Sequence, residues 1–218
     1  MKNKEERGSK DMDELPNTFV KPPSKIPFLF KIGLLIAKKE TGKDLLPARL
    51  LTWYPRAAIG SGVLEMMTAK GGNKEEQRIL NLVRLQTSLI CSCRFCIDMN
   101  ALGIEKNGIT DQELEVLQGK REIQDVNTFS LRELLALEYA VSLSITPPDL
   151  AETFIKNLTQ QFSEKEIVML ASTIASVNYW ARLNQGLGVP PAGFSDRCLI
   201  YQKNKASMVT NMTTKQKT

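Results

Sequence analysis

Residues 74–100 read KEEQRILNLVRLQTSLICSCRFCIDMN, a long apolar run that ends in three cysteines. On a helix drawn over 74–90, large apolar side chains occupy nearly every side. They are Ile79, Leu80, Leu82, Val83, Leu85, Leu89 and Ile90. A helix with so little polar face usually lies in the centre of a bundle or in an oligomer interface. This stretch therefore predicts a helix in the centre of a bundle or in an oligomer interface, with the cysteines placed near its end.

Helix signals continue on the C-terminal side of this stretch. Three capping boxes predict helix starts: Thr110 with Glu113, Ser130 with Glu133, and Ser163 with Glu166. The second helix should stop before Pro147 and Pro148, and the third at GLGVPP, residues 186–191. Strand-like alternation is not evident in the sequence. We predict an all-α, single-domain helical bundle of about seven or eight helices.

The ends of the chain differ from its body in composition. Residues 1–25 predict a flexible N-terminal arm, residues 26–200 the helical domain, and residues 201–218 a flexible basic tail. The formal charge is +5, of which 1–25 carry +1 (six Lys/Arg, five Asp/Glu) and 196–218 carry +4 (five against one). Residues 26–195 therefore sum to zero, so no basic face for nucleic acid is predicted.

Compartment and membrane contact are also constrained by the sequence. The first residues, MKNKEERGSKDMDELPNTF, lack the apolar core of a secretory signal, and the run IPFLFKIGLLIA at 26–37 is too short to span a bilayer. Four cysteines in 218 residues do not make a disulfide framework. We expect a cytoplasmic protein with no membrane partner. Because the chain contains no histidine, Ser-His-Asp triads, Cys-His dyads and HExxH metal sites are excluded.

Cys93 and Cys96 form a Cys-x-x-Cys pair, the spacing of a redox dithiol. Gly103 and Gly108 limit a helix predicted from about Cys93 to Glu105, which places Cys93 near its N-cap. Residues three apart share one helix face, and a bridge between them has acceptable geometry. Amide donors at a helix start favour a thiolate, and a thiolate can be oxidised by peroxide and resolved by a neighbouring thiol.

Two other interpretations of the cysteines remain open. Buried cysteines are commonly inert small hydrophobes. Alternatively, Cys91, Cys93, Cys96 and the distant Cys198 could form a four-sulfur metal site, although structural zinc more often uses two Cys-x-x-Cys pairs.

Three segments resemble the carboxymuconolactone decarboxylase superfamily, in particular its alkylhydroperoxidase D-like branch. They are RILNLVRLQTSLICSCRFCIDMNALG (78–103), LLTWYPRAAIGSGVLEMMTAKG (50–71) and SVNYWARLNQGLGVPPAGFSDRC (176–198). The resemblance extends from about Leu45 to Cys198, and the Cys-x-x-Cys segment is its most specific part. It implies an all-α fold that forms homodimers, trimers or hexamers through the helices bearing the motif. The decarboxylases themselves lack the paired cysteines, so the motif favours the redox branch.

The resemblance also implies roles for individual residues. Cys96 would be the peroxide-reactive thiolate, and Cys93 its proton donor and resolving partner. Peroxidase members of the family place a glutamate twelve residues before the first cysteine and a histidine four after the second. Here those positions are Asn81 and Asn100. An asparagine can hydrogen-bond to sulfur or water, but it cannot remove a proton. A slow peroxidase, or none, is therefore expected.

Other residues are weaker candidates for the same site. Asp98 and Glu138 are carboxylates that could act as a base, although Asp98 should point to another face and Glu138 should be a surface charge or a core ion-pair member. Tyr139, Tyr179 and Trp180 could line a pocket, although core packing is the ordinary role of such residues.

The combined prediction is a thiol–disulfide oxidoreductase with antioxidant, peroxidase-type activity at a redox-active Cys-x-x-Cys centre. It would act on a small hydroperoxide or disulfide, contain no cofactor, and depend on an external thiol or dithiol reductant. The alternative is a non-catalytic or decarboxylase-like helical oligomer of the same superfamily.

Overall fold

The computed structural model describes residues 18–102 and 104–195, and within these ranges it is all-helical, as predicted. The α-helices are α1 (Phe28–Thr41), α2 (Leu46–Leu51), α3 (Pro55–Met66), α4 (Lys74–Ile90), α5 (Arg94–Asn100), α6 (Asp111–Leu117), α7 (Leu131–Ser144), α8 (Glu152–Gln161) and α9 (Glu164–Gly186). Two 3₁₀ turns, η1 (Ile104–Asn107) and η2 (Ile123–Asp125), connect them. The count of nine α-helices in the described residues slightly exceeds the expected seven or eight.

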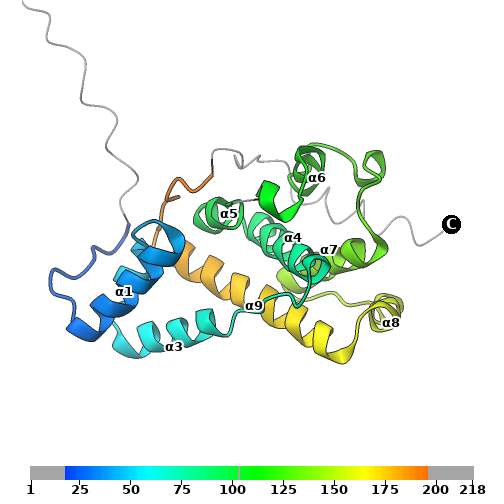
Figure 1. Cartoon of the computed structure of the whole chain (residues 1–218). Helices are drawn as coiled ribbons and strands as arrows, with labels where there is room; N and C mark the ends of the chain where they lie inside the picture. Colours follow the sequence, from blue (N-terminus) through cyan, green and yellow to red (C-terminus); the bar gives the residue numbers. More distant parts are fainter. Residues whose placement is uncertain (1–17, 103, 196–218) are drawn as a thin grey trace, which may run out of the picture.

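Helix α4 forms the centre of the bundle, one of the two locations that its apolar sequence predicts. It packs against α5, α7 and α9, with α6 and α8 at the outer end of this group (Figure 1). One side of α4 packs with α7, α8 and α9 around Ile79, Val83 and Ile174. Its other side packs with α6 and α7 around Leu82 and Leu85. The C-terminus of α4 is thereby fixed, and the cysteines follow it directly.

The three predicted capping boxes are present, at the N-termini of α6, α7 and α9. Two of them are joined by one arginine of α4. Arg78 donates from Nη2 to Glu113 at 2.6 Å and from Nε to Glu133 at 2.6 Å. Both carboxylates are buried, and each belongs to a capping box. Arg78 therefore holds the starts of α6 and α7 against α4.

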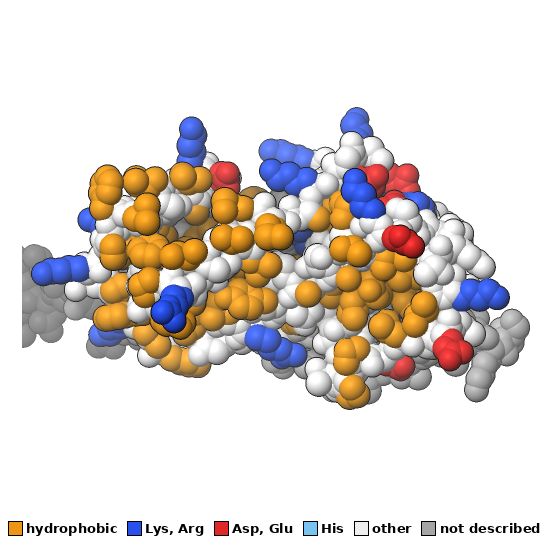
Figure 2. Space-filling view, turned by 90° about the horizontal axis from the view of Figure 1, so that it is seen from below, with side chains coloured by type: hydrophobic (Ala, Val, Ile, Leu, Met, Phe, Trp, Pro, Cys, Tyr) orange, Lys and Arg blue, Asp and Glu red, His pale blue; other side chains and the backbone are white. Residues whose placement is uncertain are grey.

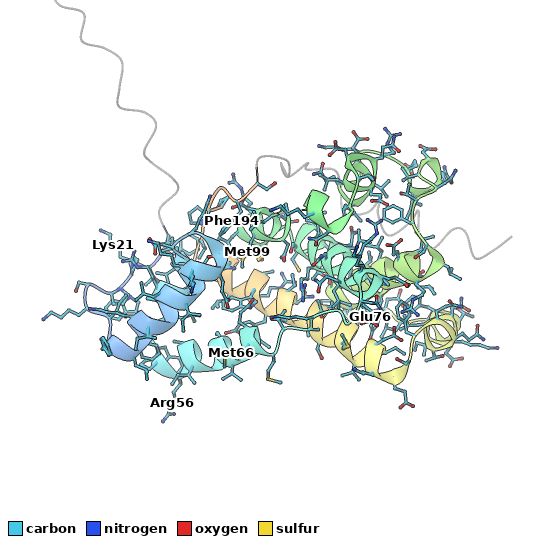
Figure 3. All side chains as sticks on the ribbon, in the orientation of Figure 1. Lys21, Arg56, Met66, Glu76, Met99 and Phe194 are labelled. Atoms are coloured by element: carbon cyan, nitrogen blue, oxygen red, sulfur yellow. A yellow bond between two sulfur atoms is a disulfide. The ribbon has the colours of Figure 1, made fainter. Side chains whose placement is uncertain are left out.

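Helices α1 and α3 lie beside the C-terminal end of α9 (Figure 1), and almost none of their residues are buried. No residue of α1 is buried, and in α3 only Ser61 is. Figure 3 places Arg56 and Met66 near the two ends of α3. Two contacts hold α3 to α9: Tyr179 Oη and Ser61 Oγ are 2.6 Å apart, and Trp180 Nε1 donates to Glu65 at 3.1 Å.

Of the predicted N-terminal arm, residues 18–25 lie within the described range. The Phe19 N–H donates to the Leu187 carbonyl at 3.1 Å, and the Phe19 ring lies over Gly188, whose φ is +67°. The positive φ favours glycine at this position, and a Cβ there would lie 3.0 Å from the ring, so the ring would have to shift slightly to accept a side chain. Residues 1–17 and the predicted tail at 201–218 lie outside the described residues. No helix in the described part of the chain is long and apolar enough to cross a membrane.

Candidate active site

The cysteines lie in a tight turn between α4 and α5. Cys91 caps the C-terminus of α4, and Ser92 has the left-handed φ of +52° that lets the chain reverse. The Cys93 N–H then donates to the Ser88 carbonyl at 3.2 Å. Cys93 is the N-cap of α5, as predicted. The prediction that this helix reaches Glu105 was wrong: α5 ends at Asn100, where the hydrogen bonds tighten to i→i+3 spacing.

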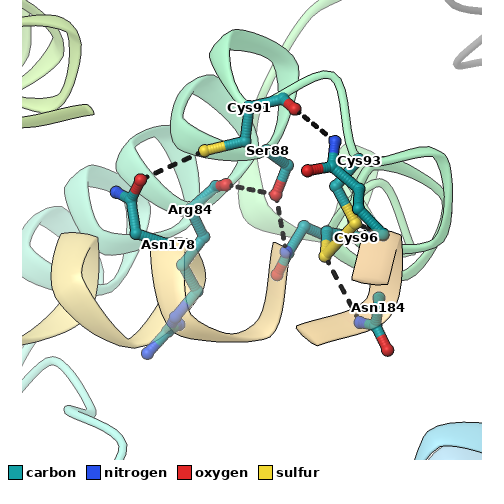
Figure 4. The surroundings of a disulfide bond; sticks show 9 residues. Arg84, Ser88, Cys91, Cys93, Cys96, Asn178 and Asn184 are labelled. Atoms are coloured by element: carbon teal, nitrogen blue, oxygen red, sulfur yellow. Dashed lines mark hydrogen bonds between the residues drawn. A yellow bond between two sulfur atoms is a disulfide. The ribbon is translucent and has the colours of Figure 1, made fainter. Parts of the chain in front are cut away.

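Cys93 and Cys96 lie side by side and are joined as a disulfide (Figure 4). Their Cα atoms are 5.2 Å apart, within the usual range for bridged cysteines. The Cys96 backbone N–H donates to Cys93 Sγ at 3.3 Å. The first turn of α5 therefore sets the separation of the pair, and the sequence spacing alone predicts this proximity. Such a pair can cycle between a dithiol and a disulfide without rearrangement of the helix.

The pair is buried. Cys93 is 1% exposed and Cys96 is 4% exposed, among apolar neighbours that include Leu50, Ala181 and Val189. Apolar surroundings disfavour a charged thiolate unless hydrogen-bond donors reach the sulfur. They also restrict access, so a reagent that reaches Cys96 must be small or must enter when the surrounding segments open.

One polar side chain of α9 reaches the pair. Asn184 Nδ2 donates to Cys96 Sγ at 3.6 Å, and Figure 4 shows the side chain directed at that sulfur. Asn184 is only 1% exposed. Sequence reasoning missed it, although a signal exists: Asn184 continues the apolar stripe formed by Ile174, Val177 and Ala181. A polar residue on such a stripe faces the interior, where it needs a partner.

Asn81 and Asn100 occupy the positions of the glutamate and the histidine of the family's peroxidase members. Their hydrogen bonds differ from the predicted ones. Asn100 Nδ2 donates to Ser88 Oγ at 3.0 Å, and Ser88 Oγ donates to the Arg84 carbonyl at 2.8 Å. Asn81 Oδ1 accepts from Gln77 at 3.1 Å and from Arg84 at 3.3 Å. The hydrogen bonds that the structure gives these side chains therefore lie along α4 and do not end on sulfur. Their predicted catalytic roles stay predictions.

Asp98 has a structural role, because it binds backbone groups of a distant segment. It is buried, and its two oxygens accept from the backbone N–H groups of Ala192 (2.7 Å) and Ser195 (2.8 Å). Lys43 donates to the Ala192 carbonyl at 2.6 Å. We call residues 189–195 the strap, because these bonds hold them against α5. Val189 and Ala192 of the strap pack onto the cluster that contains the cysteines.

The remaining cysteines do not complete a metal site within the described residues. Cys91 is buried, and its thiol donates to Asn178 Oδ1 at 3.2 Å. No group of three His, Cys, Asp or Glu side chains suited to a metal ion occurs in the described part of the chain. Cys198, the fourth sulfur of the metal hypothesis, lies outside that part.

Of the other candidates of the sequence analysis, Trp180 packs against the apolar cluster that contains the cysteines, whereas Tyr139 belongs to a different cluster. Glu138 is half-buried, and burial raises the pKa of its carboxyl. Tyr139 packs against Phe154 and lines a cavity of about 500 Å³ between α7 and α9. Neither Cys93 nor Cys96 lines this cavity. Asn178 connects the cavity with Cys91, because it lines the cavity and its Oδ1 accepts a hydrogen bond from the Cys91 thiol.

Comparisons with known proteins place the fold. No family model matches the chain. The uncharacterized protein YnjA of Escherichia coli is 28% identical over 189 residues, which cover 84% of this chain and 97% of YnjA. Among solved structures, an uncharacterized peroxidase-related protein of Ralstonia eutropha, described as an alkylhydroperoxidase AhpD core, gives a TM-score of 0.66 at 14% identity. That match covers 83% of this chain and 95% of the other.

The debrominase Bmp8 is a third similar protein. A single-residue variant of it, in complex with 2,3,4-tribromopyrrole, gives a TM-score of 0.62 at 16% identity and covers 90% of this chain and 98% of its own. At these identities the likeness concerns the fold. The chain has the fold of the alkylhydroperoxidase D-like proteins, as the resemblance in its sequence predicts.

Proposed function

We propose that the protein is a thiol peroxidase that reduces small hydroperoxides with Cys96 and Cys93 and is restored by an external thiol or dithiol. The observation that carries this proposal is the pairing of Cys93 with Cys96 at the first turn of α5, with Cα atoms 5.2 Å apart. Hydrogen bonds to both sulfurs add support, because donors stabilise thiolates. The cycle needs no resident cofactor, and a reducing compartment such as the cytoplasm would supply the thiols.

Burial decides which oxidants suit this site. A bulky disulfide must approach Cys96 in line with its own S–S bond, and a side chain that is 4% exposed leaves little room for that approach. Hydrogen peroxide and short alkyl hydroperoxides need far less space. We therefore place small hydroperoxides before protein disulfides as substrates.

The turnover should be slow. General-base assistance is worth roughly 10²–10⁴-fold, and neither Asn81 nor Asn100 can remove a proton. The same substitutions fit the alternative function, a non-catalytic helical oligomer in which turnover is not required. The two functions differ in whether the dithiol responds to peroxide.

Mapping the disulfides after oxidation separates the two. The fully reduced protein, treated with a small excess of hydrogen peroxide, is expected to form a Cys93–Cys96 bond within the chain, seen by mass spectrometry of its peptides. In Cys93→Ser the resolving thiol is missing, so a sulfenic acid should accumulate at Cys96 and react with dimedone. Peroxide-treated wild-type protein that keeps both thiols would rule out the peroxidase and leave the non-catalytic oligomer.

The proposal includes assembly of identical chains through α1 and α3, in place of the motif-bearing helices that the family resemblance implies. Figure 2 shows hydrophobic side chains gathered over the part of the surface that these helices form. Exposed large apolar residues there include Phe28, Leu29, Ile32, Leu35, Ile36, Ile59, Val63, Met66 and Met67. Isolated helices of about 12–15 residues are marginal in water, and α1 has 14 residues with none buried. A second copy of the chain would supply the missing cover.

Charge substitutions in this apolar face are expected to separate the subunits. Leu35 is 66% exposed and Met66 is 80% exposed, so Leu35→Glu with Met66→Glu places two charges in the face without disturbing the core. Light scattering after size-exclusion chromatography should show an oligomer for the wild-type protein and a mass of 24.4 kDa for the double variant. Val168→Glu, at a residue of α9 that is 64% exposed, is the matched control and should stay oligomeric. A wild-type protein that runs as a monomer would contradict the assembly.

A further inference from the structure

The cavity of about 500 Å³ between α7 and α9 has no part in the proposed peroxidase chemistry, because neither Cys93 nor Cys96 lines it. Its volume falls within the roughly 300–1,000 Å³ that small-molecule sites occupy. The part of its wall that α9 supplies extends from Ala171 to Arg182. Over that stretch the helix rises roughly 16 Å, so the cavity is long enough for a chain of several carbon atoms.

The two ends of the cavity differ in polarity. The residues at one end pack in a single apolar cluster: Tyr139, Leu143, Ala171 and Ile174. One turn further along α9, Asn178 Nδ2 donates to Ser144 Oγ at 3.1 Å, which places the C-terminus of α7 at the second end. Arg182 follows one turn later and is exposed, so it lies at the mouth. The lining therefore changes from apolar to polar and cationic along α9.

The groups still available at the polar end are hydrogen-bond donors. Arg182 has no ion pair or side-chain hydrogen bond within the described residues, and none of the lining residues is acidic. Ser144 is 6% exposed, and its hydroxyl accepts from Asn178 but donates to no acceptor in the described part of the chain. Asn178 is already engaged, because its Oδ1 accepts from the Cys91 thiol. A guanidinium and a hydroxyl together suit a carboxylate.

We propose that this cavity binds a small aliphatic carboxylate, with its head group at Arg182 and Ser144 and its chain lying toward Ile174. The C-terminus of α7 opposes an anion there, since a helix end carries about half a negative charge. The full positive charge of Arg182 exceeds it. This inference goes beyond the proposed peroxidase function and does not depend on it.

Octanoate is the test ligand, and calorimetric titration of the full-length, reduced protein gives its dissociation constant. The wild-type protein should bind one octanoate per chain. Butyrate, which is four methylenes shorter, should bind at least about tenfold more weakly, because each buried methylene contributes to affinity. Octylammonium has the same tail with the opposite charge and should bind at least about fivefold more weakly. Octanoate that does not saturate, or octylammonium that binds as tightly, would overturn the proposal.

Arg182→Gln removes the cation at an exposed position and should weaken octanoate binding by about fivefold or more, without weakening octylammonium. Lys31→Gln is the matched control, because it removes the same charge beside the apolar face of α1. Its octanoate affinity should stay within about twofold of wild type. Equal losses in the two variants would place octanoate on α1, and Arg182→Gln with wild-type affinity would remove the role of the guanidinium. Either result contradicts the proposal.

Filling the cavity tests the location directly. Ala175 lines the cavity and is exposed, so Ala175→Phe adds bulk there without disturbing the core. Octanoate affinity should fall at least about tenfold, while peroxide still produces the Cys93–Cys96 bond. A variant that is folded by circular dichroism and binds octanoate like wild type would rule out the site; if it does not fold, Arg182→Gln and octylammonium decide. A wild-type protein inert to peroxide would end the peroxidase proposal and leave the octanoate result standing.

Discussion

Replacing Arg78 with methionine is expected to lower the free energy of unfolding by about 3–5 kcal/mol, the usual cost of removing one partner from a buried ion pair. Arg78 bonds to two carboxylates whose side chains are 1% exposed (Glu113) and 6% exposed (Glu133). Methionine preserves the aliphatic part of the side chain but leaves both charges without their cation. Urea unfolding followed by circular dichroism gives the difference by linear extrapolation.

Arg121→Met is the matched control for this variant. Arg121 pairs with Glu115 at 2.9 Å, but both side chains are about 40% exposed. Exposed pairs contribute about 0–1 kcal/mol, so this variant should unfold close to the wild-type midpoint. If the two substitutions cost the same, the bonds of Arg78 are no stronger than a surface pair.

The response to acid gives Arg78→Met a second signature. Burial alone would raise the pKa of Glu113, but hydrogen bonds from Thr128 and Arg78 outweigh it and hold the pKa below its ordinary value of 4.5. A carboxyl with a lowered folded pKa contributes stability that is fully present above 4.5 and is lost as the pH falls through the folded value. Without Arg78 the folded pKa of Glu113 rises. The acid unfolding midpoint of the variant should therefore lie at higher pH than that of the wild-type protein.

The second large effect concerns Cys96. Cys96→Ser is expected to abolish peroxide consumption, with initial rates at least about 100-fold lower than wild type in an assay driven by excess dithiothreitol. A serine hydroxyl in the same place cannot form a sulfenic acid or a disulfide. The rate is followed as loss of hydrogen peroxide, after subtraction of its direct reaction with dithiothreitol.

Cys91→Ser is the control for this loss, because it removes a neighbouring buried cysteine but keeps a hydroxyl donor for Asn178. Its rate should stay within about twofold of wild type, since Cys91 takes no part in the proposed steps. Equal losses in Cys91→Ser and Cys96→Ser would indicate that the turn between α4 and α5 has been disturbed and would not support Cys96 as the attacking residue.

Local signals in the sequence predicted much of the fold. The capping boxes at Ser130 and Ser163 identify helix starts because the hydroxyl and the carboxylate three residues later satisfy each other's backbone donors within one turn. The bounds predicted for the central helix, 74–90, agree with α4. The end of α5 was misplaced because glycine marks only a limit, whereas the turn at Asn100 depends on packing that no local pattern encodes.

The candidate site was predicted only where its geometry is local. Cys93 and Cys96 are three residues apart at a helix start, so their contact follows from spacing. Asn184 is 88 residues from Cys96 in sequence, and their contact exists because α9 packs across α5. The bonds of Asp98 to the strap have the same non-local origin, so sequence could only offer Asp98 as a free carboxylate.

The strap has a kinetic consequence for the proposed reaction. Asp98 and Lys43 anchor residues 189–195 over the sulfurs, and Lys43 also lies 4.9 Å from the centre of the Phe194 ring. A reagent too large to diffuse through the packed side chains must wait until these bonds break and the segment lifts. For such reagents the observed rate would level off with concentration at the opening frequency of the segment, whereas hydrogen peroxide would show a rate that keeps rising.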